Sequence, residues 1–372
     1  MDPLRERALS LTEGLQPTPK NIERVATATS TTAAEWAFSQ WDLRARAKSK
    51  FALARRMLFT REALEQATHE EVARFHAAKF PAGERVVDLT CGIGSDLIAL
   101  ARRGPAFGVD LDSERLELAR HNLEAYGLRA ELEEADALDT ARRRDGDYYI
   151  ADPSRRLGGR RILDPNAFSP DPAALARALR GSQLSLIKLS PMLPDDYLQG
   201  LGPGLEFVSF GGECREALVL LGERAVPGRR AVQVESGEVL NACVSDAAWS
   251  EPQAWLFDPD PAATRAHAVG SLCIDYKLSL LSGETGYLTG SEPVESVWLK
   301  RYRVLEWGSY DRKRLNRDLS RHGCAIPVLK QRGAGLDLDR MKRELRSHGE
   351  RGAVLAFYLM GKSLRYILAE PA

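Results

Sequence analysis

The stretch VVDLTCGIGSDLIAL, residues 86–100, begins as an apolar strand, passes through a turn with Gly92 and Gly94, and continues as an apolar helix. Glycine allows a backbone to approach a ligand closely. A leucine replaces the third glycine of a dinucleotide fingerprint, and the GK[ST] ending of a phosphate-binding loop is absent. Asp88 and Asp96 flank the turn, and their carboxylates would repel a pyrophosphate but tolerate a cation. The turn therefore predicts a ligand site that is not a phosphate cradle.

Strand and helix patterns alternate from residue 85 onward. Strands are expected at 85–90, 106–110, 129–133, 147–152, 184–189, 205–210 and 216–221, and helices at 94–103, 113–126, 172–181 and 194–200. This alternation predicts an α/β fold with a seven-stranded, Rossmann-like and mostly parallel sheet covered on both faces. Only GGECR separates the last two strands, which is too short for a helical crossover, so they should form an antiparallel hairpin.

Different patterns flank this central region. The first 80 residues carry apolar positions at intervals of three and four, which predicts helices. Beyond residue 225, short strands alternate with turns rich in Gly and Pro, and the last segment resembles a hairpin. We therefore expect a helical N-terminal domain (1–80), the α/β domain (81–225) and an α+β domain (226–372).

Charge is distributed unevenly along the chain. Lys and Arg balance Asp and Glu at 52 each, but residues 42–61 hold seven basic residues against one acid, a net charge of +6. Residues 291–372 hold 17 basic residues against 10 acids, a net charge of +7. Basic segments of this kind are typical of nucleic-acid contacts and also of solvated helix faces. Charge alone leaves both interpretations open.

The composition favours a cytoplasmic protein. No apolar run approaches the roughly 20 residues that span a bilayer, and the charged start MDPLRERALS is unlike a secretory signal. The five cysteines lie far apart without a CxxC pair, which predicts neither a metal site nor a disulfide framework. The oligomeric state is left open.

Acidic residues follow the second and third expected strands. Asp110 lies 18 residues beyond Gly92, where a carboxylate can accept both hydroxyls of an adenosine ribose. Asp136 can accept a hydrogen bond from the exocyclic amine of adenine, while Ala137 leaves room for the ring. The alternatives are a helix cap for Asp110 and a surface turn for Asp136.

The fourth expected strand ends in ADPSRR. Ligands of open parallel sheets bind beyond the carboxyl ends of the strands, so Asp152 would stand on the rim that faces a substrate. Pro153 would hold Asp152 and the Ser154 carbonyl group rigidly. Arg155 and Arg156 follow and could contact phosphates. The alternative is a turn followed by a solvated basic loop.

Taken in order, these four strand ends resemble those of class I S-adenosylmethionine-dependent methyltransferases over about residues 75–222. VDLTCGIGSD is similar to the first motif of that family, Asp110 to the second, EADA to the third and ADPSRR to the fourth. The resemblance implies S-adenosyl-L-methionine as the cofactor and a catalytic role for the residues of the fourth motif, Asp152, Pro153 and Ser154. It implies cofactor contacts from Asp88, Thr90, Gly92, Gly94, Asp96, Asp110, Leu111, Asp136 and Ala137.

The helix after the second motif narrows this resemblance. VDLDSERLELARHNLEAYG is similar to the trimethylguanosine-synthase-like branch, which acts on guanine amines in RNA, through Ala119, His121, Asn122, Tyr126 and Gly127. That branch usually has DPP or SPP with an aromatic residue that stacks on the base, whereas this chain has DPSR. DPSR also resembles the DPPR of 5-methyluridine methyltransferases, but IKLSPM lacks their cysteine nucleophile, so uracil chemistry is not expected.

Segments on either side of the α/β domain also resemble parts of methyltransferases. The segment PVLKQRGAGLDLDRMKRELRSHGERGAVLAFYLMGKSLRYIL resembles the THUMP-like domain that follows some bacterial methyltransferases, and because THUMP domains bind structured RNA it implies an RNA partner. Residues just before the first motif often close over the cofactor in this fold. Phe59, Thr60, Arg61 and Gln66 could form such a lid, and Lys50, Arg55 and Arg56 could meet RNA. The alternative is an amphipathic helix packed on the edge of the sheet.

These features predict a methyltransferase that acts on a base of tRNA or rRNA, with an exocyclic amine as the favoured acceptor. Asp152 would orient the amine, and Arg61, Arg155 and Arg156 would bind the substrate. The methyl group of the cofactor is intrinsically activated, so positioning would be the main contribution of the protein. Two alternatives remain: a methyltransferase for a small molecule or a protein, and a non-catalytic RNA-binding protein that keeps the fold.

Overall fold

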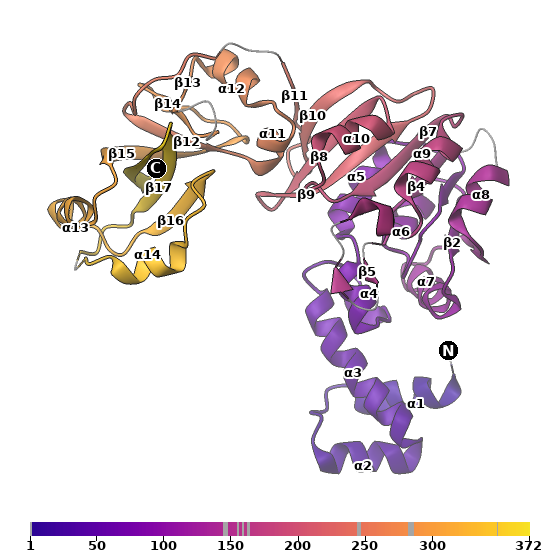
Figure 1. Cartoon of the computed structure of the whole chain (residues 1–372). Helices are drawn as coiled ribbons and strands as arrows, with labels where there is room; N and C mark the ends of the chain where they lie inside the picture. The colour runs from indigo at the N-terminus through magenta and orange to yellow at the C-terminus, as the bar shows by residue number, and fades with distance from the viewer. Residues whose placement is uncertain are drawn as a thin grey trace. The chain divides into compact units, whose positions relative to one another are not determined.

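The computed structural model describes residues 2–143, 148–154, 156–157, 160–161, 164–243, 247–281, 286–347 and 349–372. The chain divides into two compact units (Figure 1). One contains residues 1–205 and 217–227, and the other contains residues 206–216 and 228–372. The three-domain boundaries drawn from the sequence stay predictions. In the described part of the chain, no helix combines the length and the apolar character that crossing a membrane requires.

Helices build the N-terminal part of the first unit, as the periodicity predicts. They are α1 (Pro3–Thr12), α2 (Pro19–Ala28), α3 (Thr31–Ala47), α4 (Arg61–Gln66) and α5 (Glu70–Ala78). Ser30 and Thr60 begin α3 and α4, because each hydroxyl group accepts a backbone N–H of the first turn. Buried apolar residues of α1, α2 and α3 form one core cluster, and α3 also contacts α4.

The centre of the first unit is a largely parallel sheet. Its strands are β1 (Val86–Asp88), β2 (Ala106–Asp110), β3 (Glu131–Glu134), β4 (Tyr148–Ala151) and β7 (Leu184–Leu189), followed by β8 (Gly204–Phe210) and β9 (Glu213–Leu221), of which residues 206–216 are counted with the second unit. They follow the order β3-β2-β1-β4-β7-β9-β8, with β9 antiparallel to β7. The expected strands and the reversed final strand are confirmed. The strand order changes direction between β1 and β4, where open α/β sheets bind ligands.

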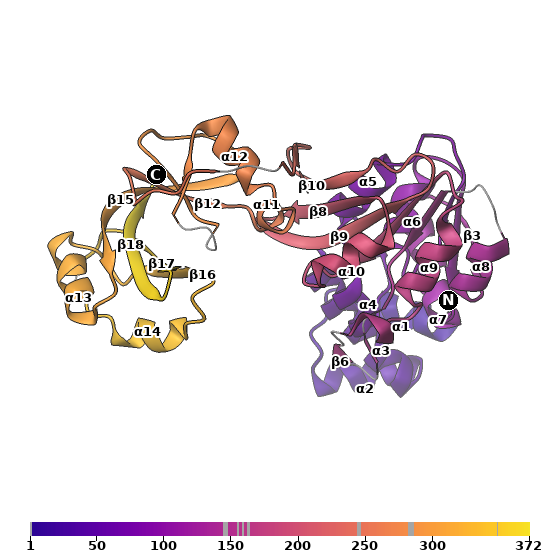
Figure 2. The ribbon, with the colours of Figure 1, turned by 45° about the horizontal axis from the view of Figure 1, so that its top comes forward.

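Helices cover both faces of this sheet. They are α6 (Ser95–Ala101), α7 (Ser113–Ala125), α8 (Ala137–Arg143), α9 (Pro172–Leu179) and α10 (Asp195–Leu201). Helices α5, α6 and α7 contact one another in series, as do α8, α9 and α10 (Figure 2). The sequence predicts all of these except α8, because its sequence ALDTARR has a single large apolar residue and therefore shows no apolar face. A short ribbon of β5 (Arg156–Leu157) and β6 (Arg160–Arg161) follows β4.

The sheet is wider than the seven expected strands. β10 (Gly228–Gln233) and β11 (Val239–Asn241) extend it beyond β8 to nine strands. The sequence predicts a strand in this region, AVQVE, within the C-terminal domain; its residues do belong to the second unit, but the sequence does not predict that the strand pairs with β8. Without β10, β8 would present a row of unpaired backbone N–H and C=O groups, so the next strand of the chain adds to that edge.

The second unit has the expected α+β character, with a seven-stranded sheet in the order β13-β14-β12-β15-β18-β17-β16. Its strands are β12 (Trp255–Pro259), β13 (Ser279–Leu280), β14 (Leu288–Gly290), β15 (Leu299–Ser309), β16 (Val328–Arg332), β17 (Val354–Met360) and β18 (Ser363–Pro371). Its helices are α11 (Pro261–Arg265), α12 (Val269–Tyr276), α13 (Arg312–Arg321) and α14 (Leu338–Glu344). β17 and β18 form the predicted closing hairpin, and α13 and α14 share one core cluster with the sheet.

Candidate functional site

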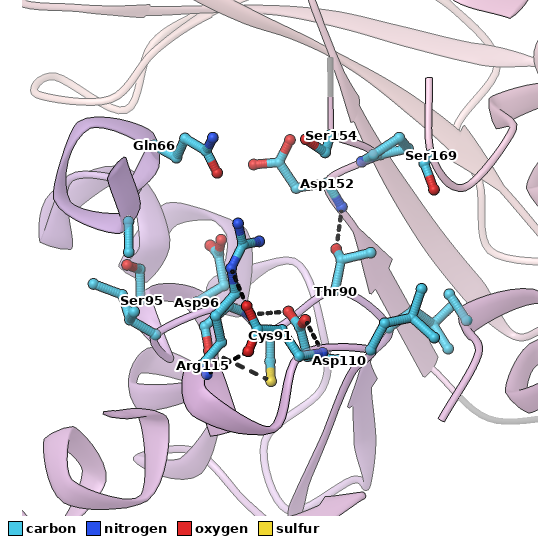
Figure 3. A pocket seen from close by; sticks show the side chains of 18 of the residues that line it. Gln66, Thr90, Cys91, Ser95, Asp96, Asp110, Arg115, Asp152, Ser154 and Ser169 are labelled. Atoms are coloured by element: carbon cyan, nitrogen blue, oxygen red, sulfur yellow. Dashed lines mark hydrogen bonds and ion pairs between the residues drawn. The ribbon is translucent and has the colours of Figure 1, made fainter. Parts of the chain in front are cut away.

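A cavity of about 590 Å³ lies at the carboxyl ends of the central strands of the first unit. This volume is typical of sites that hold small ligands and cofactors. The residues that follow β1, β2, β3 and β4 line the cavity, together with α4 and the residues after it. Figure 3 shows Asp110 and Arg115 at one end and Asp152, Ser154 and Gln66 at the other.

The two glycines of the turn serve different purposes. Both have a positive φ, 53° at Gly92 and 90° at Gly94, which other residues adopt only with strain. Gly92 lines the cavity, and an added Cβ would meet no protein atom within 4 Å. At Gly94 an added Cβ would stand 3.4 Å from the Cβ of Ala119 on α7. Gly92 therefore leaves space on the cavity side, whereas Gly94 allows α6 and α7 to approach each other.

Asp110 fixes the turn to the end of β2. Its Oδ2 accepts the N–H of Gly92 at 2.9 Å, and its Oδ1 accepts the N–H of Asp112 at 3.0 Å. Each carboxylate oxygen has two lone pairs, so both can accept a further hydrogen bond from a ligand. Leu111, which follows, lines the cavity with a side chain that is 64% exposed.

Asp136 begins α8, which settles its local role as a helix cap. Its Oδ1 accepts the backbone N–H groups of Leu138 at 2.8 Å and Asp139 at 3.0 Å. No described residue donates a hydrogen bond to its Oδ2, and both Asp136 and Ala137 line the cavity. Capping and ligand binding are therefore compatible at this carboxylate.

Asp152 stands at the opposite end of the cavity. Its backbone N–H donates to Thr90 Oγ1 at 2.7 Å, which ties the end of β4 to the turn after β1. Pro153 and Ser154 also line the cavity, and the Ser154 backbone pairs with Ser169 in both directions. The Asp152 side chain is 47% exposed. Arg155 and the side chain of Arg156, which were predicted to bind substrate, lie outside the described residues.

A buried ionic network lies next to this end of the cavity. Lys188, on β7, is 3% exposed, and its ammonium group donates to Thr68 Oγ1 at 2.6 Å and to Asp96 Oδ2 at 2.9 Å. The same group lies 2.9 Å from Asp152 Oδ2. His76 is fully buried, with Nδ1 at 2.7 Å from Asp96 Oδ1. A carboxylate can only accept, so this Nδ1 carries the proton.

Sequence reasoning misses three members of this network. Thr68 and His76 lie in ordinary polar positions around α5, and their spacing gives no signal. Lys188 does give a signal, because it is the one charged residue within the apolar strand LSLIKL, and a buried charge requires a partner.

The network determines the charge of the two acids that flank the turn. Burial by itself raises the pKa of Asp96, but Lys188 and His76 outweigh that effect and hold the pKa well below its usual range. Burial raises the pKa of Asp88 well above its usual range, and the neighbouring Asp96 raises it further. Asp88 lies beneath the turn, where its Oδ1 accepts the Thr90 N–H at 3.2 Å. The cavity therefore meets the ionised, paired Asp96, while Asp88 supports the turn from below.

Polar residues of α7 fasten the N-terminal segment to the glycine turn. Asn122 is fully buried; its Oδ1 accepts the Leu58 N–H at 2.8 Å, and its Nδ2 donates to the carbonyl groups of Leu58 at 3.1 Å and Ile93 at 3.0 Å. His121 and Tyr126 also contact the N-terminal segment. His121 Nε2 lies 3.0 Å from the Arg56 carbonyl oxygen, and the Tyr126 hydroxyl group donates to Glu70 Oε2 at 3.0 Å. In this chain, these three residues of the A-x-H-N-x-x-x-Y-G pattern all have structural contacts.

The residues considered for a lid before the first motif separate into different roles. Gln66 lines the cavity. Phe59 is buried in the core, and Thr60 caps α4. Arg61, predicted to bind substrate, has a side chain that is 78% exposed and lies 3.6 Å from Glu65.

Lys50 was one of the residues that could meet RNA, with a structural role as the alternative, and the structure uses it inside the unit. Its ammonium group donates to the carbonyl oxygens of Leu64 at 2.9 Å, Glu65 at 3.3 Å and Ala67 at 2.8 Å. These carbonyl groups lie at the end of α4, where a helix lacks hydrogen-bond donors and favours a positive charge. The positive charge of residues 42–61 is thus partly structural.

Comparisons with known proteins agree with this arrangement. Residues 86–151 match the methyltransferase domain family, and residues 299–371 match the THUMP domain-like family. The chain is 35% identical over 319 residues to an uncharacterized S-adenosylmethionine-dependent methyltransferase of Mycobacterium tuberculosis, and the alignment covers 84% of this chain and 87% of that relative. The fold is similar to a crystal structure of a Porphyromonas gingivalis W83 protein assigned as a methyltransferase, with a TM-score of 0.76, 20% identity, and coverage of 99% of this chain and 98% of that one.

Proposed function

The chain belongs to the family of S-adenosylmethionine-dependent methyltransferases, and from this premise we propose that it methylates an exocyclic amine of a base in cytoplasmic tRNA or rRNA. The observation that carries the proposal is the carboxylate of Asp152. Lys188 holds its Oδ2, and no described residue donates a hydrogen bond to its Oδ1, on a side chain that lines the cavity. An ionised carboxylate accepts hydrogen bonds and cannot donate them, so it suits an acceptor that presents N–H groups.

S-adenosyl-L-methionine is the cofactor of this family, and the residues of the cavity fit it. Asp110 and Asp136 lie at successive strand ends and keep lone pairs after their backbone hydrogen bonds. We assign the ribose hydroxyls to Asp110 and the exocyclic amine of adenine to Asp136, with Leu111 against the ring. The glycine turn at Gly92 would pass close to the rest of the cofactor.

When bound, the cofactor supplies a sulfonium methyl group, which an acceptor nitrogen takes with loss of one proton as the sulfonium becomes a thioether. Asp152 Oδ1 would accept a hydrogen bond from the amine and pass that proton to water, since the side chain is about half exposed. Pro153 and the backbone pairing of Ser154 with Ser169 hold the carboxylate in place. Correct placement of two reactants is worth up to roughly 7–11 kcal/mol of the barrier.

The THUMP-like part of the second unit supports an RNA substrate. Helices α13 and α14 lie near each other on one face of its sheet, because both pack on the same core cluster and the Arg346 N–H donates to Asn316 Oδ1 at 2.8 Å. Their outer faces carry exposed cations, and no described residue forms an ion pair with any of these. They are Lys313 and Arg317 on α13, Lys342 and Arg343 on α14, and Arg346, which follows α14. Such a group of cations can neutralise phosphates.

The decisive experiment identifies the methylated product. The full chain is incubated with methyl-labelled cofactor and total cellular RNA, and the RNA is digested to nucleosides. We expect label in a nucleoside methylated on its exocyclic amine. Label on a ribose, on a ring carbon or only in protein would refute the proposal.

Asp152→Ala tests the acceptor carboxylate separately from the cofactor site. We expect methylation to fall below detection, while S-adenosylhomocysteine still raises the Tm nearly as much as in the wild type, because a ligand that binds the folded state stabilises it. If the Tm response disappeared together with the activity, Asp152 would be a structural residue of the cofactor site.

The basic face of α13 and α14 gives a quantitative test of RNA binding. Each phosphate contact that is lost should lower the magnitude of the slope of log K, for RNA binding, against log salt concentration by about 1. The double variant Lys313→Ala/Arg317→Ala should therefore lower this slope by about 2. Lys362→Ala is the matched control, because Lys362 is exposed in the turn between β17 and β18. Equal effects of the control and the double variant would contradict a specific RNA face.

One observation favours a different acceptor. Among the described residues that line the cavity, Arg115 is the only basic one, whereas six are acidic: Glu65, Asp96, Asp110, Asp112, Asp136 and Asp152. An acidic lining attracts a cationic amine of a small molecule or a protein and opposes a polyanion. Competition separates the two cases: excess RNA should inhibit labelling of RNA, and it should leave the labelling of a small cationic amine unchanged.

A further inference from the structure

The topology places Lys188 directly beside the acceptor carboxylate. β4 and β7 are parallel neighbours, with Ala151 paired to Ile187. The next residue on each strand, Asp152 and Lys188, therefore stands at the same level of the sheet. Lys188 is buried, and its ammonium group lies 2.9 Å from Asp152 Oδ2.

The surroundings of this ion pair are acidic. The same ammonium group lies 2.9 Å from Asp96 Oδ2, and Asp88 is buried below the turn. Carboxylates that are close together disfavour ionisation of one another, and a nearby cation reverses that effect. Without Lys188, Asp152 would face the Asp96 carboxylate with no compensating charge from β7, and nothing from β7 would hold its Oδ2.

We propose that Lys188 is the positioning residue of methyl transfer: it holds Asp152 Oδ2, which fixes the orientation of the carboxylate and leaves Oδ1 for the acceptor amine. The same ammonium group also binds Asp96, on α6, and Thr68, which follows α4. One buried cation thus connects the acceptor end of the cavity to the helix that follows the cofactor turn. The inference rests on the proposed function, because it assigns Asp152 the role of acceptor carboxylate.

The test must separate this role from a contribution to folding. Lys188→Met alone would leave Asp96 buried without its cation, and such a loss is strongly destabilising. The main comparison is therefore between Asp96→Asn and the double variant Asp96→Asn/Lys188→Met, both as full chains. Lys188→Arg in the native background is the conservative variant, since it keeps the charge.

Three results are expected if Lys188 positions Asp152. S-adenosylhomocysteine raises the Tm equally in Asp96→Asn and in the double variant. The double variant has a kcat about 10²-fold lower, the usual effect of a misplaced reacting group. Its acid limb of kcat/KM moves up by about 1–3 pH units, the effect of losing an adjacent opposite charge, whereas Lys188→Arg keeps the acid limb of the wild type.

A second measurement does not depend on the acceptor. The full chain is labelled with ¹³C at aspartate carboxyl groups, and the signal of Asp152 is identified by its absence in Asp152→Asn. The midpoint of that titration should move to higher pH in the double variant relative to Asp96→Asn. If the wild type methylates no RNA, the proposed function fails, yet this titration still decides the role of Lys188.

Two outcomes would overturn the inference. One is an acid limb and an Asp152 titration that are the same with and without the lysine. The other is a parallel loss of activity and of the S-adenosylhomocysteine response in the double variant, which would make Lys188 part of the cofactor site.

Discussion

Gly92→Ala, compared with Gly94→Ala, tests how the glycine turn meets the cofactor. Both positions have a positive φ, so each substitution carries a similar backbone cost of about 1–2 kcal/mol. For a unit of this size that cost should lower the Tm by roughly 2–8 °C. The added methyl groups go to different places: the cavity side at Gly92 and the Cβ of Ala119, 3.4 Å away, at Gly94.

The two variants should therefore respond differently to ligand. In the wild type, S-adenosylhomocysteine at 100 times its Kd stabilises the fold by about 2.7 kcal/mol. If the methyl group in Gly92→Ala raises the Kd about 100-fold, the same concentration contributes only about 0.4 kcal/mol. Gly94→Ala should show a lower Tm without ligand and nearly the full increase with it.

Thermal melts at several ligand concentrations, with far-UV circular dichroism to confirm folding, decide between these outcomes. A full ligand response in Gly92→Ala would refute the idea that this glycine leaves room for the cofactor. If instead Gly94→Ala lost the Tm increase caused by S-adenosylhomocysteine and Gly92→Ala kept it, Gly94 would be the glycine that leaves room for the cofactor.

Three further substitutions test the site from other directions. Asn122→Ala should lower the free energy of unfolding by about 2–5 kcal/mol, because it leaves buried backbone groups of Leu58 and Ile93 without partners; a change below about 1 kcal/mol in urea unfolding would contradict this. Asp136→Ala should lower the free energy of unfolding by about 1 kcal/mol, because α8 loses its N-cap. It should also weaken the binding of S-adenosylhomocysteine at least tenfold in calorimetry. Asp139→Ala, on the same helix, is the control and should leave that affinity unchanged. The pKa of Asp96 is held below its usual range, so its carboxylate stabilises the fold above pH about 4, and this stabilisation is lost as the pH falls. In Asp96→Asn, the free energy of unfolding should therefore fall less steeply between pH 4 and 3, by up to about 1.4 kcal/mol per pH unit. If the free energies of unfolding of the wild type and the variant fell with the same slope, the pairing of Asp96 would be refuted.

Much of the site could be predicted because its parts are local. The glycine turn, Asp110, Asp136 and Asp152 each follow a strand directly, so a short stretch of sequence shows each of them. A parallel sheet then brings all carboxyl ends to one edge, which makes sequence order sufficient to infer that they meet. The hairpin of β8 and β9 could be predicted in the same way, because the segment that connects them is too short for a helical crossover.

The partners of these residues could not be predicted, because they are distant in sequence. Lys188 lies 92 residues from Asp96 and 120 from Thr68, and no spacing rule connects them. Lys50 could have faced RNA or had a structural role, and in the structure it donates to carbonyl groups at the end of α4, 14 and 17 residues away in sequence. The strand β10 lies in the second unit, as expected, but no local pattern predicted that it would pair with β8.

The sequence by itself thus determined the α/β fold, the glycine turn and the carboxylates at the strand ends, since hydrophobic period and turn chemistry are properties of short segments. Only the tertiary structure decided which charges are paired, which acid is buried beneath the turn, and which lysine reaches Asp152. The physical reason is that burial makes an unpaired charge costly, so each buried charge takes whichever partner the packing of distant strands and helices provides.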